Sequence, residues 1–91
     1  MSEETLEQVA EAVQLLERIS EDTTVPRNIR RAATNSLEII REPDHELSLA
    51  VKANNAIEIL DEISQDPKCP AHARTMLLQL ITLLEITDYD Y

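Results

Sequence analysis

The sequence contains an internal repeat. A shift of 44 positions within the 91 residues aligns six identical residues in fixed order: Leu16 with Leu60, Ile19 with Ile63, Ser20 with Ser64, Asp22 with Asp66, Pro26 with Pro70, and Arg30 with Arg74. Apolar residues recur at three- and four-residue steps on both sides of each matched segment, which is the period of one helix face. The repeat therefore predicts two copies of one helical hairpin, each with the pattern I-S-x-D-x-x-x-P-x-x-x-R at its bend.

Two helical hairpins fit one compact arrangement. Two units are too few for a stable solenoid, whose repeats bury their apolar faces against neighbours. Hairpins that close face to face bury both apolar stripes at once, so we expect an all-α, antiparallel up-and-down four-helix bundle. The predicted single domain covers residues 1–86, and a short acidic tail covers 87–91. The expected helices span about 3–20, 26–41, 45–65 and 70–86.

Local signals place the helix starts and the inward faces. Pro26 and Pro70 suit the first helical position because proline has a fixed φ and lacks an N–H. Asp44 is the expected cap of the third helix. The inward face predicted for the first helix is Leu6, Val9, Val13, Leu16 and Ile19, and that of the second is Ile29, Ala33, Leu37 and Ile40. The third is predicted to bury Leu47, Ala50, Ala53, Ile57, Leu60 and Ile63.

Composition excludes several function classes. The chain has no glycine, which rules out a phosphate-binding P-loop, a dinucleotide fingerprint and a G-x-S-x-G nucleophile elbow. One cysteine allows no internal disulfide. The net charge of −10 repels nucleic acid as a whole. No apolar run approaches a membrane span and no signal peptide opens the sequence, so we expect a cytoplasmic protein without membrane contact.

The conserved spacing within the repeat predicts braced bends. Asp22, Pro26 and Arg30 recur as Asp66, Pro70 and Arg74. The structural interpretation is that Asp22 pairs with Arg30, and Asp66 with Arg74, across each bend.

Three arginines at the start of the second helix are the candidate recognition residues. Arg27, Arg30 and Arg31 occupy the first turns, where the helix dipole disfavours cations. Arg27 and Arg31 are four residues apart and repel each other, and the repeat has Ala71 and Thr75 in their place. Cations at a helix end where the dipole disfavours them suggest a partner that compensates for the unfavourable charge. Candidate partners are an acidic protein, a phosphate or an RNA backbone.

Catalytic and metal-binding constellations are weak. Cys69 and His72 lie three residues apart, but no second cysteine or spaced histidine completes a ligand set. The paired carboxylates lie on polar helix faces, where solvation explains them. We therefore expect no metal, no cofactor and no enzymatic activity.

The third and fourth helices depart from a simple stripe. The fourth carries more apolar residues than one buried face needs, and Met76, Leu80 and Leu83 are the candidate surface for self-association into a dimer. In the third helix, Asn54 lies among small residues. Close helix packing is the first interpretation of this segment, and a half-buried Asn54 that lines a cavity is the alternative.

The chain also resembles a known family. The motifs that carry the resemblance are Pro26-Arg27-Asn28-Ile29-Arg30-Arg31-Ala32-Ala33, the segment 57–64, Asp66-Pro67, and Pro70-Ala71-His72-Ala73-Arg74-Thr75. They are similar to those of uncharacterised protein family 0147, which comprises short acidic helical proteins of archaea. The resemblance implies a four-helix bundle in an archaeal cytoplasm. It implies no activity and no site residues, because the family has none established.

Together these features predict a small protein-interaction module that can self-associate. The alternative is an RNA-associated or anionic-ligand-binding protein that uses the arginine cluster Arg27, Arg30 and Arg31.

Overall fold

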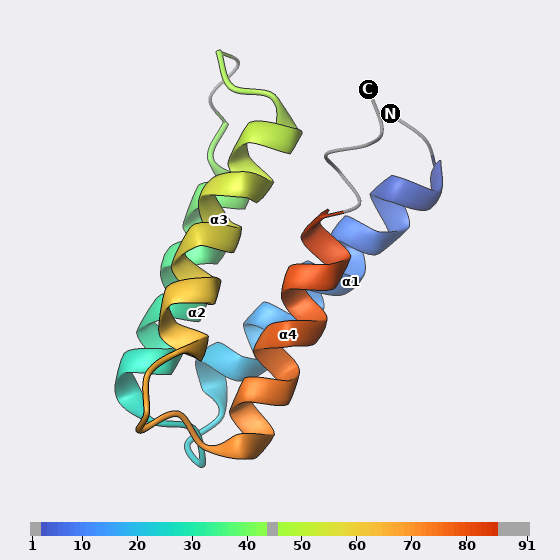
Figure 1. Ribbon diagram of the computed structural model, residues 1–91. Helices are drawn as coiled ribbons and strands as arrows, with labels where there is room; N and C mark the ends of the chain where they lie inside the picture. Colours follow the sequence, from blue (N-terminus) through green and yellow to red (C-terminus); the bar gives the residue numbers. More distant parts are fainter. Residues whose placement is uncertain (1–2, 44–45, 86–91) are drawn as a thin grey trace.

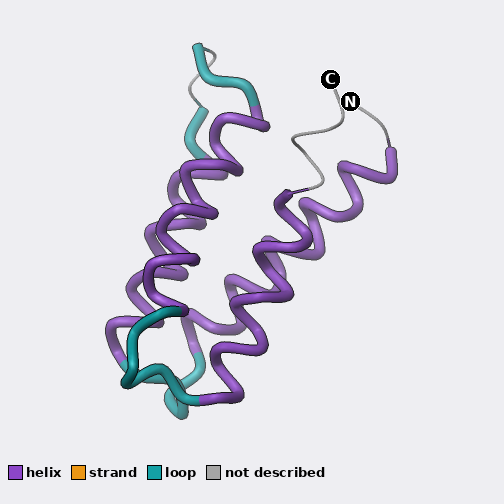
Figure 2. The backbone as a smooth tube through the Cα atoms, viewed as in Figure 1, coloured by secondary structure: helices purple, strands orange, loops and turns teal. Residues whose placement is uncertain are grey.

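The computed structural model describes residues 3–43 and 46–85, which form four helices and no strand (Figures 1 and 2). The helices are α1 (Glu3–Glu21), α2 (Arg27–Arg41), α3 (Leu49–Ser64) and α4 (Ala71–Glu85). α1 packs on α2 and α4, and α3 packs on the same two helices, whereas the backbones of the diagonal pairs do not approach each other closely in the described part of the chain. This square arrangement confirms the up-and-down four-helix bundle.

In α1 and α4 the core follows a strict alternation of four- and three-residue steps. In α1 it comprises Thr5, Val9, Ala12, Leu16 and Ile19, and in α4 it comprises Ala73, Leu77, Leu80 and Leu84. The prediction for the start of α1 was wrong, because the Leu6 side chain is 53% exposed and Thr5 is 2% exposed. Thr5 lies four residues before Val9 on the same face of the helix. Packing against the neighbouring helices therefore buries Thr5, although Leu6 is the more apolar residue.

The two bends have the same local structure. The carbonyl oxygen of Asp22 accepts the Val25 N–H at 3.1 Å, and that of Asp66 accepts the Cys69 N–H at 2.9 Å. Each aspartate also accepts, through Oδ1, the N–H two residues ahead, from Thr24 and Lys68, both at 2.9 Å. These are Asx turns, in which the side chain takes the place of a backbone acceptor. The sequence repeat is therefore a structural repeat.

The third helix begins later than expected. Residues 46–48 are not helical, and the Ser48 hydroxyl oxygen accepts the Val51 N–H at 3.2 Å as the N-cap of α3. Asp44, the expected cap, lies outside the described residues. Leu47 precedes the helix and is exposed, so its predicted place in the core was wrong. Asp44 and Ser48 both precede the same apolar stripe, and Ser48, which is adjacent to the stripe, caps the helix.

The apolar surplus of α4 is mostly covered within the bundle. Leu80 is fully buried, so its prediction as a self-association residue was wrong. Met76 and Leu83 are half-buried and pack against the core, and the exposed large apolar residue of the helix is Leu78. Its neighbours α1 and α3 thus cover apolar residues on both sides of the buried stripe. None of the described helices is both long and apolar enough to cross a membrane.

Candidate functional site

Charge is divided unevenly along the bundle. Residues 17–31 and their repeat counterparts 61–75 carry six of the eight lysines and arginines and an equal number of carboxylates. The rest of the chain carries two cations and twelve carboxylates, so it accounts for the whole net charge of −10. The two segments flank the bends, at the same end of the bundle (Figure 1). We call this region the bend end; it is electrically balanced, whereas the rest of the protein is strongly acidic.

The cations of α2 differ in how far they reach solvent. Arg27 and Arg31 are exposed and form no ion pair with another described residue. Arg30 is half-buried, and its Nε is buried without a hydrogen-bond partner among the described residues. Pro26 precedes the helix and provides no side-chain cap. Arg27 and Arg31 therefore present free guanidinium groups next to a helix N-terminus, where the dipole disfavours them.

A row of exposed polar residues runs the length of α2 and is named here the α2 stripe. It comprises Arg27, Arg31, Thr34, Asn35, Glu38 and Glu42, all exposed. Arg41, three residues after Glu38, borders the row and is exposed, but its guanidinium group is paired with Glu17 of α1. This row lies on the opposite side of the helix from the buried Ile29 and Ile40. Its cations are at the N-terminal end and its carboxylates at the C-terminal end, which is the reverse of what the helix dipole favours. α1 follows the favourable order, with Glu3 and Glu4 first and Arg18 last.

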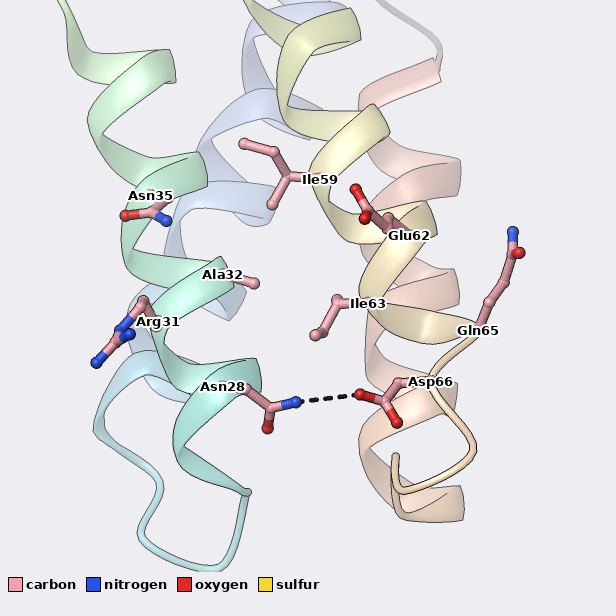
Figure 3. A pocket seen from close by; sticks show the side chains of 9 residues that line it. All are labelled: Asn28, Arg31, Ala32, Asn35, Ile59, Glu62, Ile63, Gln65 and Asp66. Atoms are coloured by element: carbon pink, nitrogen blue, oxygen red, sulfur yellow. Dashed lines mark hydrogen bonds between the residues drawn. The ribbon is translucent and has the colours of Figure 1, made fainter.

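Beside the stripe, a groove of about 420 Å³ follows the seam between α2 and α3 (Figure 3). Ala32, Ile59 and Ile63 provide its apolar part. Asn28 donates its Nδ2 to Asp66 Oδ2 at 3.3 Å at the bend end of the groove. In Figure 3, Arg31 points away from α3 and toward solvent. The guanidinium group is therefore available to a partner outside the bundle.

A second groove, of about 370 Å³, continues along the same seam and shares Asn35 with the first. Lys52 is buried at this seam and donates its Nζ to the Glu42 carbonyl oxygen. Asn55 lines the groove, whereas Asn54 is exposed and lines neither groove. The alternative of a half-buried Asn54 that lines a cavity is therefore wrong. The seam presents amide groups along its whole length.

The bends are braced differently from the prediction. Neither Asp22 with Arg30 nor Asp66 with Arg74 forms an ion pair in residues 3–43 and 46–85. Instead, Arg74 donates to backbone carbonyl oxygens, from Nε to Ser64 at 3.0 Å and from one terminal nitrogen to Asp66 at 3.4 Å and Cys69 at 3.5 Å. The aspartate carboxylates are already engaged in their Asx turns, and the Arg74 guanidinium group binds carbonyl oxygens of the second bend instead.

Hydrogen bonds and charge act together on the Asp22 carboxylate. Its Oδ1 accepts the Thr24 hydroxyl at 2.6 Å and the Thr24 N–H at 2.9 Å. These bonds stabilise the ionised form and lower the pKa of Asp22 below 3.8, and the positive charges of His72 and Arg30 act in the same direction. Burial opposes the pKa shift without reversing it. Asp22 is thus an anionic brace of the first bend.

The candidate metal ligands Cys69 and His72 differ in exposure. His72 is exposed in the first turn of α4, whereas Cys69 is buried, with its Sγ directed at the Pro70 carbonyl oxygen at 3.7 Å. Within the described part of the chain, no group of three histidine, cysteine, aspartate or glutamate residues has the placement to hold a metal ion.

Comparison with known proteins identifies the relatives of this chain. The sequence model of the uncharacterised protein family UPF0147 matches residues 1–87. This chain belongs to that family. A UPF0147 protein of Methanothermobacter thermautotrophicus is 49% identical over 85 residues, which cover 93% of this chain and 78% of the relative. One from Aeropyrum pernix is 55% identical over 74 residues, which cover 81% and 79%.

The fold is also that of UPF0147. The crystal structure of a UPF0147 protein from Thermoplasma acidophilum matches this chain with a TM-score of 0.88 and 33% sequence identity, over 93% of this chain and 98% of the other. The resemblance found in the sequence is thus confirmed for both family and fold. UPF0147 is described as uncharacterised, so a functional argument must start from the surface of this chain.

Proposed function

We propose that this UPF0147 protein is a non-catalytic protein-interaction module whose recognition surface is the α2 stripe. The observation that carries the proposal is the exposed, unpaired state of Arg27 and Arg31 at the end of α2 where the helix dipole opposes them. Placing the two cations there costs stability within the isolated protein. A protein partner with facing carboxylates offsets that cost through charge-assisted hydrogen bonds.

The same stripe argues against RNA as the first choice. Glu38 and Glu42 lie on the row that carries Arg27 and Arg31, so a phosphate backbone laid along α2 meets two carboxylates beyond the cations. A net charge of −10 adds long-range repulsion. A protein surface, in contrast, can place both signs of charge opposite the stripe. RNA or another anionic ligand held by Arg27, Arg30 and Arg31 is the alternative.

Affinity capture from a lysate of the native host, with and without nuclease, tests this function. The bait is the full chain, compared with the double variant Arg27→Glu, Arg31→Glu. The matched control is Arg18→Glu, Lys68→Glu, which changes two exposed cations of the bend end that lie off the stripe. We expect a defined protein that survives nuclease and high salt better than an RNA complex does, is lost by the stripe variant and is kept by the control.

Two results would contradict the proposal. Recovery that disappears with nuclease would favour the RNA alternative. Equal recovery by the wild type and the stripe variant would show that Arg27 and Arg31 take no part in recognition.

A further inference from the structure

We propose that the partner of the α2 stripe is a second copy of this chain, bound antiparallel about a twofold axis that passes between Thr34 and Asn35. This inference rests on the proposed function and names the occupant of the same surface. It places self-association on α2, and not on Met76, Leu80 and Leu83 of α4, where Leu80 is fully buried and the other two pack against the core.

The charges of the stripe are complementary to those of a second stripe that runs in the opposite direction. Arg31 and Glu38 are equally far, in opposite directions, from the midpoint between residues 34 and 35, and the same holds for Arg27 and Glu42. In an antiparallel pair of α2 helices, Arg31 of each copy therefore faces Glu38 of the other. Arg27 faces Glu42 in the same way. A twofold axis makes every such contact occur twice, which is the property of an isologous interface.

The helix dipole supports the same orientation. Within one copy, the cations of the stripe are at the positive end of α2 and its carboxylates at the negative end, and both placements are unfavourable. Arg41, in the last turn, follows the favourable order. In the antiparallel pair, the N-terminal end of one α2 lies beside the C-terminal end of the other. Each set of side chains then meets a helix end of the opposite sign. A second α2 that lies antiparallel against the stripe thus compensates its reversed polarity.

The middle of the stripe suits the crossing point. Thr34 and Asn35 are exposed and uncharged, so no like charges meet at the axis. The Thr34 hydroxyl donates to the Arg30 carbonyl oxygen of its own helix at 3.1 Å, and it needs no partner from the second copy. Asn35 lines both grooves of the α2–α3 seam, and its amide can pair with Asn35 of the second copy because an amide carries donors and an acceptor.

The contact is mainly charged and amide-bearing, with apolar area supplied only by the seam beside it. Such interfaces are small, and exposed charge pairs are screened by salt. We therefore expect a weak dimer whose dissociation constant rises by about tenfold or more when sodium chloride increases from about 0.05 to 0.5 M.

Charge reversal at one symmetric pair gives the test. Arg31→Glu places two glutamates opposite each other in a homodimer, and Glu38→Arg places two arginines opposite each other. We expect each variant alone to be monomeric by sedimentation equilibrium at concentrations where the wild type is dimeric. Mixed in equal amounts, the two variants regain complementary pairs and form a heterodimer. The chain that carries both changes also regains the homodimer.

The fold and the proposed function have separate readouts. Both changed side chains are exposed, and circular dichroism checks that each variant keeps its helix content. A monomeric wild type at about 1 mM chain, near the weak limit of specific association, would overturn the inference. Failure of the mixture and the double variant to dimerise would also overturn it. In either case, capture of a different protein that depends on Arg27 and Arg31 would leave the proposed function standing.

Discussion

Asn28 at the start of α2 donates its Nδ2 to Oδ2 of Asp66 in the second bend, at 3.3 Å. Its repeat counterpart is His72 at the start of α4, whose charge lowers the pKa of Asp22 in the first bend. In each hairpin, the residue two positions after the proline thus interacts with the bend aspartate of the other hairpin. The duplication gives the bend end an approximate twofold relation, with a neutral amide on one side and a histidine on the other.

The two arginines of the repeat should differ in their effect on stability. Arg74→Met removes the hydrogen bonds to three bend carbonyls and should lower the free energy of unfolding by about 1–2 kcal/mol. Arg30→Met removes a buried Nε that has no partner in the described residues and should change it by less than about 0.5 kcal/mol. Urea denaturation measures both, and equal losses would contradict the asymmetry.

Leu80 and Leu78 provide a matched pair on α4. Leu80→Ala should lower the free energy of unfolding by about 2–5 kcal/mol because it opens a cavity in the core. Leu78→Ala, at a position 52% exposed, should change it by less than about 0.5 kcal/mol. Thermal unfolding followed by circular dichroism measures the two. A mild effect at Leu80 would show that α4 turns this residue outward.

The fold could be predicted from the sequence because the repeat and the apolar periodicity agree. The phase of α1 could not, since Thr5 and Leu6 are neighbours and only packing against the other helices decides which one is buried. The start of α3 was missed because Asp44 and Ser48 are both good capping residues and precede the same apolar stripe. Sequence propensity predicts that a helix is present, and tertiary contacts determine where it begins and which face is buried.

Ser36 has a hydroxyl group that the core does not use. The residue is fully buried in α2, and its Oγ has no hydrogen-bond partner among the described residues. Ser36→Ala should raise the free energy of unfolding by about 1 kcal/mol, because it removes a desolvated polar group and improves helix propensity. Urea denaturation at neutral pH is the measurement. A loss of stability would instead indicate a buried water or a partner for the hydroxyl.

Acid should weaken the first bend through Asp22. Its folded-state pKa is depressed below 3.8, so its ionised form contributes stability that is complete above this pH and is lost as the pH falls through the folded value. Asp22→Asn should flatten the fall in stability below about pH 4. Thr24→Val removes the hydroxyl donor and should raise the pKa of Asp22, as read from the carboxyl carbon shift in an NMR titration. An unchanged shift curve would contradict this role of Thr24.

The candidate site was only partly visible in the sequence. Arg27 and Arg31 stood out because they break the dipole rule, and they are exposed as expected. Glu38 and Glu42 were missed, although their spacing from the arginines was a readable signal. Acidic residues are common in this chain, and only their place on the outward face of α2 distinguishes these two from the others.

The central claim is that two copies meet at the middle of the α2 stripe, and one cysteine measures it directly. In Asn35→Cys the new thiol lies beside the proposed twofold axis, whereas in Gln79→Cys it lies on the exposed side of α4. The native Cys69 is buried, so the unsubstituted chain is the second control. Under mild oxidation we predict a disulfide-linked dimer of Asn35→Cys that forms much faster than that of Gln79→Cys and slows in high salt. Equal rates for the two variants would contradict the account.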